Sequence, residues 1–450
     1  MPLLPLDATL HLHERVLHWI FFVALALPSR PAAEPTAAAD EENERRQLFA
    51  ETFDQHWQEM RDAYPYFDLY GVDWDAEREE HRDAAINAPD PTHFAWELAR
   101  LFTCLPDPHL AFVPPPETMR TWSVPDVEIR SVERRPLVLR WPEGEVPPRP
   151  AGIAHDVPEI VAVRGAPAVP IAQILAAGPP GTSLELRLRW SDATETTWTV
   201  QRPETANVTP PSTHYGKGWL HVGRVGSVGY LRIRTFDPSR ATLGADGKIT
   251  TMLRAALREL ADTEALILDL QQNGGGLVAA SDPFLGHFLK KAARYRWGNS
   301  GGKQRVVRPR KPLYDGAVVA IVDAGSASGG EWAARILRDA QRATVLGGRT
   351  AGAEAAVHTS SAPDGSMVHY SAWPFEPRRS SERRPFQEVG IALDHELPLT
   401  VAEVRRLGYD AALDEVRAAR YALALKLCGG PPSDLDALLS LAAEAETKAE

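Results

Sequence analysis

The spacing of hydrophobic positions changes twice along the chain and divides it into three regions. In residues 41–115 apolar side chains recur every three to four positions, and in "RQLFAETFDQHWQEM" these are Leu48, Phe49, Phe53 and Trp57. This period predicts helices. Another helix is expected in "DPTHFAWELARLFTCL", with Asp90 as its N-cap and Pro91 at its first position. We therefore expect residues 41–115 to form an N-terminal helical domain.

Residues 120–211 change to the alternating or clustered β-formers that are typical of strands. The segments "PLVLRW", "EIVAVRG", "SLELRLRW" and "TTWTVQR" are separated by turns rich in Pro, Gly, Asp, Asn and Ser. One short helix is expected in "VPIAQILAAG", ending at Gly178. This pattern predicts a small β-rich module, of a kind that often recognises peptides.

In residues 215–400 buried strands alternate with amphipathic helices. A pair of strands is expected in "VGRVGSVGYLRIRTF", followed by the nearly continuous apolar runs "ALILDL", "AVVAIVD" and "ATVLGG". The helical segments "ITTMLRAALRELA" and "GGEWAARILRDAQ" lie between them. Such strands predict an α/β sheet that helices cover on both faces. Residues 401–450 are expected to form a helical tail with a break at "CGGPPSD".

Length, charge and cysteine content narrow the class of protein. At 450 residues the chain is expected to form two or three domains. Its 49 basic and 60 acidic side chains give a net charge of −11, which argues against non-specific nucleic-acid binding. Cys104 and Cys428 belong to no CxxC motif or Cys/His cluster, so no zinc site is indicated. They could form one disulfide or remain two buried thiols.

The first 33 residues have the pattern of an export signal. The run "WIFFVALAL" is too short to span a bilayer, and small residues and then acidic residues follow it. We expect residues 1–33 to be a signal peptide and the protein to be exported, to the periplasm or the cell exterior. A short membrane anchor and a misassigned start codon are the alternatives, because Arg15 is the only Lys or Arg before the run.

Two of the predicted strands end in loops that are suited to catalysis. Open α/β sheets bind ligands at the carboxyl ends of their strands, where "LDLQQNGGG" and "VDAGSASGG" follow here. The bare backbone N–H groups of three glycines are what an oxyanion hole requires. Ser328 precedes a helix, whose N-terminus favours a developing anion. Each loop alone could be an ordinary cap or turn, and neither GxxxxGK[ST] nor GxGxxG follows a strand.

Together, at a separation of about fifty residues, the two loops resemble those of the C-terminal processing (tail-specific) serine peptidases and their tricorn-like relatives. "YLRIRTF" and "GIALDHELPLT" resemble the segments that open and close their core, and "VRGAPAVPIAQILAAGPPGTSLELRLRW" resembles a degenerate PDZ-type module. The resemblance implies an α/β, crotonase-like peptidase core with an N-terminal helical domain and a small β-rich PDZ-like module. It also implies that Ser328 is the nucleophile, and that the N–H groups of Gly329, Gly274 and Gly275 form the oxyanion hole.

The expected base differs from that of the best-known branch of this family. That branch uses a lysine in a motif similar to TxGKG, whereas this chain reads "TAGAEA" and places Ala353 there. The tricorn-like branch uses a histidine from a D-x-H element, and "LPDPHLAF" supplies Asp107 and His109. A neutral imidazole, with a pKa of about 6.5, is suited to deprotonating a serine. His109 is therefore the predicted base, Asp107 could orient it, and His358 is the alternative base.

A third polar group is expected from the segment "QEVGIALDHE". In the tricorn-like branch an acid from this late region supports the site, and the candidates here are Glu388, which we favour, and Asp394. Glu331 lies one turn into the helix after Ser328 and is expected to pair with Arg335 at i, i+4. Asp339 is expected to be structural.

Three functions are compatible with this pattern. The first is a serine peptidase that cleaves a polypeptide substrate through an acyl-enzyme, without a metal or organic cofactor. The second is a non-catalytic peptide- or ligand-binding protein on the same scaffold, which the missing lysine supports. The third is a hydrolase of small esters or amides. Both catalytic loops occur together with a candidate histidine, and this favours the peptidase. The substrate and the oligomeric state are left open.

Overall fold

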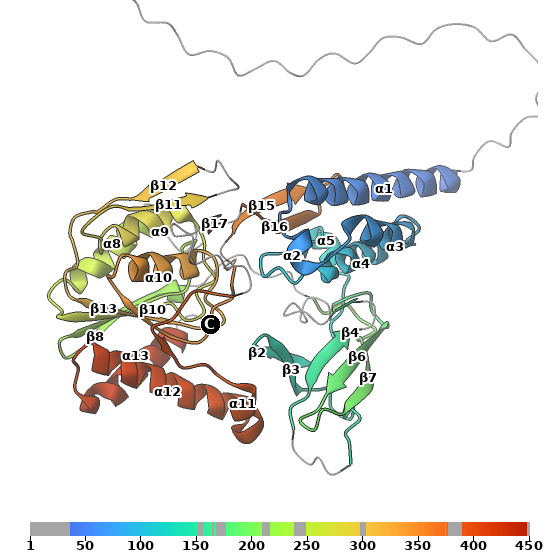
Figure 1. Cartoon of the computed structure of the whole chain (residues 1–450). Coiled ribbons are helices and arrows are strands. Elements are labelled where there is room, and N and C mark those ends of the chain that lie inside the picture. The colour runs from blue at the N-terminus through green and yellow to red at the C-terminus, as the bar shows by residue number, and fades with distance from the viewer. Residues whose placement is uncertain are drawn as a thin grey trace, which may run out of the picture. The chain divides into compact units, whose positions relative to one another are not determined.

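The computed structural model describes residues 37–151, 156–163, 166–167, 177–208, 217–237, 249–297, 303–353, 355–373, 375–376 and 389–447. The chain separates into two units, residues 1–45 and residues 46–450. In the first unit the described part is the beginning of helix α1 (Ala37–Ala63), and the predicted signal at residues 1–33 lies outside the described residues. The second unit contains all other elements (Figure 1).

Within the described ranges, no helix combines the length and the apolar character needed to cross a membrane.

Helices form the early part of the second unit, as the hydrophobic spacing predicts. After α1 they are α2 (Phe67–Tyr70), α3 (Trp74–Ile86), α4 (Pro91–Leu101), the single 3-10 turn η1 (Phe102–Cys104) and α5 (Pro116–Met119). Asp90 caps α4 as predicted, because its carboxylate accepts the backbone N–H of His93 at 2.9 Å. Of the apolar positions predicted in α1, Phe49, Phe53 and Trp57 are buried and Leu48 is exposed.

A hairpin from much later in the chain completes the hydrophobic core of these helices. Strands β15 (Ala356–Ser361) and β16 (Met367–Trp373) pair antiparallel, and β16 also pairs with β1 (Ala111–Val113). Val368 and Tyr370 of this hairpin are buried in the same cluster as the aromatic side chains of the helices. We expected residues 215–400 to form one peptidase core, but this part of the range packs into the helical region instead.

A buried histidine fastens the hairpin to α1. His56 lies between two serines of the hairpin, with Nδ1 3.2 Å from Ser360 Oγ and Nε2 2.9 Å from Ser366 Oγ. All three side chains are at most 2% exposed. Burial lowers the pKa of His56 to about 4, so the imidazole in this contact is neutral near pH 7.

The predicted β-rich module is an antiparallel sheet with the strand order β2-β3-β4-β6-β7, and β5 also pairs with β4. The strands are β2 (Glu128–Val132), β3 (Arg135–Arg140), β4 (Glu159–Val163), β5 (Ala166–Pro167), β6 (Ser183–Arg189) and β7 (Glu195–Gln201). Alternate side chains of β6 and β7 are buried, as their spacing predicts. Most of the expected helix before Gly178 lies outside the described residues, so the PDZ-like character stays a prediction.

The α/β core contains one six-stranded sheet, in the order β18-β14-β13-β10-β9-β8. Its strands are β8 (Leu220–Val225), β9 (Val228–Ile233), β10 (Ala265–Asp269), β13 (Ala317–Val322), β14 (Thr344–Gly347) and β18 (His395–Glu396). All neighbours are parallel except β8 and β9, which form the predicted hairpin. A smaller sheet joins β11 (Ala293–Trp297), β12 (Lys303–Val307) and β17 (Phe375–Glu376).

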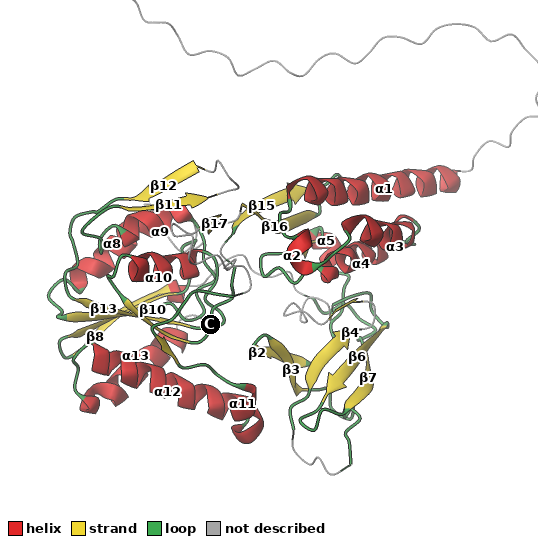
Figure 2. Cartoon of the chain, viewed as in Figure 1, coloured by secondary structure: helices red, strands yellow, loops and turns green. Residues whose placement is uncertain are grey.

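Helices cover both faces of the six-stranded sheet, as predicted (Figure 2). On one face α8 (Ile249–Glu259), α9 (Val278–Leu285) and α10 (Gly329–Asp339) bury side chains such as Leu268 of β10. On the other, α12 (Tyr409–Leu427) and α13 (Leu435–Thr447) bury its neighbour Ile267. The helices α11 (Val401–Leu407), α12 and α13 form the predicted tail, and the break lies between α12 and α13.

Candidate active site

The glycine loop (residues 270–276) and the serine loop (residues 323–328) meet because they follow neighbouring parallel strands. In the register of β10 and β13, Asp269 lies opposite Ile321, so both strands end at the same edge of the sheet. The backbone N–H of Gln272 in the glycine loop donates to Asp323 Oδ1 at 2.8 Å in the serine loop. In the opposite direction, the hydroxyl of Ser326 donates to the carbonyl of Leu270 at 2.7 Å. The sequence prediction that these loops form one site is consistent with this geometry.

The two serines of the loop differ in exposure and conformation. Ser326 is fully buried, and its hydroxyl joins the two loops. Ser328 is partly exposed and lies between β13 and α10. Its backbone φ is 49°, a value that residues other than glycine rarely adopt. A serine in a strained turn between a strand and a helix is the arrangement that exposes the nucleophile in α/β-hydrolases. Ser328 is thus the serine suited to attack a substrate.

Gly275 allows the glycine loop to approach Ser328 closely. A Cβ atom at this position would lie 2.7 Å from Ser328 Cβ and 2.7 Å from the backbone nitrogen of Gly329. Its φ of +97° is also one that L side chains rarely adopt. Two independent restrictions, space and conformation, therefore require glycine next to Ser328.

The backbone donors near Ser328 correct one of the predictions. The N–H of Gly275 already donates to Asn273 Oδ1 at 2.9 Å, so Gly275 serves the site by close approach and not as a free oxyanion donor. Gly329 is the first residue of α10, and the helix offers no acceptor to its N–H. Gly274 is exposed at the tip of its loop. Gly329 and Gly274 stay the predicted donors of the oxyanion hole.

Glu331 connects the serine loop to the segment in which related enzymes carry their lysine. Its carboxylate is fully buried and accepts the backbone N–H of Ser328 at 3.2 Å and that of Ala353 at 2.7 Å. It also accepts the Thr350 hydroxyl at 2.6 Å and the Gly352 N–H at 2.8 Å. Burial raises the pKa of Glu331, and these hydrogen bonds oppose that increase.

The prediction that Glu331 pairs with Arg335 is therefore wrong. The Glu331 carboxylate points toward backbone donors, whereas the Arg335 guanidinium lies 3.5 Å from the carboxylate of Asp339. Asp339 thus has the structural role that we expected. Ala353, for which the resemblance in sequence predicts the place of a lysine, is 1% exposed and presents no group that could accept a proton.

The candidates for the third polar group have different outcomes. Glu388 lies outside the described residues, but Gly390 and Ile391 follow it closely and pack against Thr350, whose hydroxyl accepts the Ile391 N–H at 3.0 Å. Asp394 instead accepts hydrogen bonds from Arg338 and from the backbone N–H of Val345. Asp394 therefore has a structural role beside β14, and Glu388 stays a prediction.

The D-x-H element forms a second polar cluster, on the hairpin side. Asp107 is fully buried, and its Oδ1 accepts the backbone N–H of His109 at 2.9 Å and the hydroxyl of Ser371 at 3.0 Å. The hydroxyl oxygen of Ser371 also lies 3.2 Å from His109 Nδ1. Asp107 thus reaches the imidazole through Ser371, a residue that the sequence analysis did not identify.

These contacts determine which nitrogen of His109 can accept a proton. The single hydroxyl proton of Ser371 is donated to Asp107, so the contact with His109 requires that Nδ1–H be the donor. In a neutral ring the other nitrogen, Nε2, then carries the lone pair. Nε2 is buried and has no hydrogen-bond partner among the described residues. Burial lowers the pKa of His109, and the charge of Asp107 opposes part of this shift.

The structure thus assembles two clusters. One contains Ser328, Gly275 and Gly329, the other His109 with its two partners, and among the described residues no hydrogen bond joins His109 to Ser328. The alternative base, His358, packs against the rings of Tyr370 and Trp373, with centroid distances of 5.4 and 5.8 Å.

The described residues contain no group of three or more His, Cys, Asp or Glu side chains that could hold a metal ion. Cys104 and Cys428 are free thiols, so the predicted alternative of a disulfide between them is not formed. Burial raises the pKa of Cys428 to about 12.

Comparisons with known proteins agree with the resemblance to C-terminal processing peptidases. Residues 227–397 match the model of peptidase family S41. A carboxyl-terminal-processing protease of Synechocystis sp. is 28% identical over 195 residues, which are 42% of this chain and 43% of that protein. The chain thus spans less than half the length of this curated relative.

Among solved structures, that of mature CPAF is similar with a TM-score of 0.55 and 13% identity, and the match covers 85% of this chain and 98% of that chain. A photosystem II D1 C-terminal processing protease gives a TM-score of 0.45 and 21% identity, over 82% of this chain and 98% of that chain. The likeness to mature CPAF shows a common fold over most of the chain.

Proposed function

We propose that the protein is a serine peptidase that cleaves peptide bonds through an acyl-enzyme on Ser328, because residues 227–397 match the model of peptidase family S41. The observation that carries this proposal is the close packing of the glycine loop against a strained, partly exposed serine at the ends of two parallel strands. Such a site holds a nucleophile and backbone donors at one place, as acyl transfer requires.

His109 is the proposed general base. Its imidazole is neutral near pH 7, because burial lowers its pKa, and the lone pair lies on the unpartnered Nε2. Ser328 Oγ gives its proton to Nε2 as it attacks the substrate carbonyl, and Nε2 later returns the proton to the leaving amine. Asp107, acting through Ser371, holds the ring and stabilises the imidazolium. This mechanism requires that Nε2 come within hydrogen-bond reach of Ser328 Oγ.

The N–H groups of Gly329 and Gly274 are the proposed oxyanion donors, and Glu388 is the proposed third polar group. Glu331 positions the Ser328 backbone by accepting its N–H. The chemistry needs no metal or organic cofactor. A polypeptide is the proposed substrate, and the β-rich module offers its outer strands β2 and β7 for adding an extended peptide. We further propose that the protein acts after export, which places the cleavage outside the cytoplasm.

A non-catalytic binding protein is the second candidate, since a buried alanine replaces the family lysine. Labelling by a fluorophosphonate probe separates the two functions. We expect the folded wild type to label and Ser328→Ala to lose labelling completely. His109→Ala should label at least about 100-fold more slowly, as expected for loss of a general base, while His358→Ala should stay near the wild-type rate.

The pH dependence of labelling provides an independent check of the base. Labelling should decrease as the pH falls through the pKa of His109, because protonated Nε2 cannot accept the serine proton. Since burial lowers that pKa, the midpoint should lie below about 6.5. A folded wild type that does not label between pH 6 and 9 would refute the peptidase and leave the binding protein. Slow labelling of His358→Ala with normal labelling of His109→Ala would move the base to β15.

A further inference from the structure

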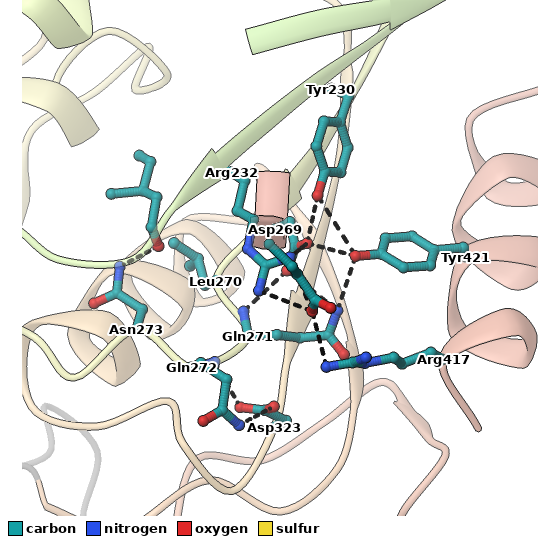
Figure 3. A network of polar contacts seen from close by, with 12 residues as sticks. Tyr230, Arg232, Asp269, Leu270, Gln271, Gln272, Asn273, Asp323, Arg417 and Tyr421 are labelled. Carbon is teal, nitrogen blue, oxygen red and sulfur yellow. Dashed lines mark hydrogen bonds and ion pairs between the residues drawn. The ribbon is translucent and has the colours of Figure 1, made fainter. Parts of the chain in front are cut away.

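Behind the catalytic loops, on the side of the sheet that α12 and α13 cover, the structure contains a cluster of buried polar side chains (Figure 3). None of its central members is more than 4% exposed, and they are Tyr230, Arg232, Asp269, Gln271, Arg420 and Tyr421. Two come from β9, Asp269 is the last residue of β10, Gln271 begins the glycine loop, and the last two belong to α12. None of them has a part in the mechanism described above.

Asp269 is the centre of this cluster. Its carboxylate accepts the hydroxyls of Tyr230 at 2.7 Å and Tyr421 at 2.6 Å, and the backbone N–H of Gln271 at 3.0 Å. The guanidinium of Arg232 lies 3.9 Å away. Burying an unpaired carboxylate is costly, so each donor is needed to keep the charge inside the protein. Burial and the Asp269 charge raise the pKa of both tyrosines, which keeps them protonated as donors.

Residues of α12 form hydrogen bonds with both the oxygen and the nitrogen of the Gln271 side-chain amide. Arg420 Nη1 donates to Gln271 Oε1 at 2.9 Å, while Gln271 Nε2 donates to Asp269 Oδ1 at 3.2 Å and to the Tyr421 hydroxyl at 3.3 Å. Arg420 is itself fixed, because its Nε donates to the carbonyl of Leu397 at 3.0 Å. The first side chain of the glycine loop is thus oriented by two neighbouring residues of a helix from the tail.

Hydrogen bonds also fix residues between Gln271 and Gly275, up to the contact with Ser328. Gln272 has a φ of 58° and is tied to Asp323. Asn273 donates its Nδ2 to the carbonyl of Ile233 at 2.7 Å, and its own carbonyl accepts the N–H of Ala327 at 2.9 Å. Gly275, two residues later, lies against Ser328. Any rotation of the loop at Gln271 would therefore displace the glycines at the nucleophile.

We propose that Tyr421 and Arg420 are positioning residues for catalysis, which hold the glycine loop in register with Ser328 through Asp269 and Gln271. This inference rests on the proposed peptidase function. In this proposal, α12 of the C-terminal tail determines the geometry of the oxyanion hole without contacting the substrate. The alternative is that the cluster only docks α12 on the sheet.

The test compares Tyr421→Phe with Tyr409→Phe in the full chain. Tyr421→Phe removes one oxygen that bonds to both Asp269 and Gln271, whereas Tyr409 lies at the start of the same helix, outside the cluster. We expect fluorophosphonate labelling of Ser328 to slow about tenfold in Tyr421→Phe and to be unchanged in Tyr409→Phe, at a temperature where both are fully folded. Gln271→Ala should slow labelling similarly, and the double variant should be no slower than the slower single variant.

Hydrogen exchange gives a readout that does not depend on activity. Peptides that cover residues 270–277 should exchange faster in Tyr421→Phe than in wild type and Tyr409→Phe. If wild type labels and Tyr421→Phe labels at the same rate, the positioning role is wrong and the peptidase stands. If wild type does not label, the peptidase is wrong, and faster exchange in Tyr421→Phe would still show that α12 holds the loop. Unchanged exchange together with unchanged labelling would leave the cluster a docking contact only.

Discussion

The serine side and the histidine side of the proposed site are built in different ways. Ser328 and Gly275 lie in the loops that follow adjacent parallel strands of one sheet, and hydrogen bonds to the backbone of Leu270, Gln272 and Asn273 join these loops. His109 depends on Ser371, which is 262 residues away and belongs to a hairpin that packs against the early helices. The serine side is therefore positioned by one sheet, whereas the histidine side is positioned by the packing of one hairpin against the early helices.

One continuous segment links the two sides. It begins at Thr350–Ala353, which is bound to the buried carboxylate of Glu331 beside the nucleophile. It continues into β15 and β16, where Ser371 meets Asp107 and His109. Ser328 is thus positioned by loops of one sheet, while His109 is positioned by a contact between residues far apart in the sequence, which is easier to perturb. Three predictions test this difference.

The largest effect is expected from Gly275→Ala on the serine side. The new Cβ would lie 2.7 Å from Ser328 Cβ in a backbone conformation with φ +97°, so the two loops must separate. Labelling of Ser328 should fall at least about 100-fold, since displacement of reacting groups by about 1 Å is enough for such a loss. Gly144→Ala is the matched control: its φ of +85° brings similar strain, but the added Cβ meets no atom within 4 Å. Normal labelling by Gly275→Ala would contradict the close approach.

A smaller effect is expected from Ser371→Ala on the histidine side. This change leaves His109 and Asp107 in place but removes the hydroxyl that connects them, so the imidazole loses its orientation. Labelling should slow by about 10- to 100-fold, less than the loss of the base itself. Ser361→Ala, an exposed position of the same hairpin, should label normally. Equal rates for the two variants would show that Asp107 acts without Ser371.

The smallest effect concerns stability and comes from His56, which docks the hairpin. Its folded pKa of about 4 lies below the ordinary value of 6.5, so the stabilisation is fully present above about pH 6.5 and is lost as the pH falls toward 4. The loss should reach up to about 3 kcal/mol of unfolding free energy. Urea unfolding of wild type and His56→Gln between pH 4 and 8 should show a shallower pH slope in the variant, and His395→Gln, at an exposed position, should retain the wild-type slope. Parallel curves for wild type and His56→Gln would remove His56 from this role.

The sequence predicted that the glycine loop and the serine loop meet, because local signals specify the strands that precede them. Continuous apolar strands fixed β10 and β13, and the loops that follow parallel neighbours must meet. Less could be predicted about individual hydrogen bonds. The Gly275 N–H donates to Asn273, and Glu331 accepts from Thr350–Ala353. Both contacts depend on side-chain packing, which the hydrophobic period does not indicate. Ser371 was missed because nothing in an alternating strand marks one serine as a partner of a distant histidine.

The pairing of β1 with β16 also sets an order of events during synthesis. Ala111 pairs with His369, so β1 cannot complete its sheet until residue 369 has been made. At about 5–20 residues per second, the ribosome needs roughly 15 to 50 s between these two strands. His109 therefore gains its contact with Ser371 only after the intervening residues have been made.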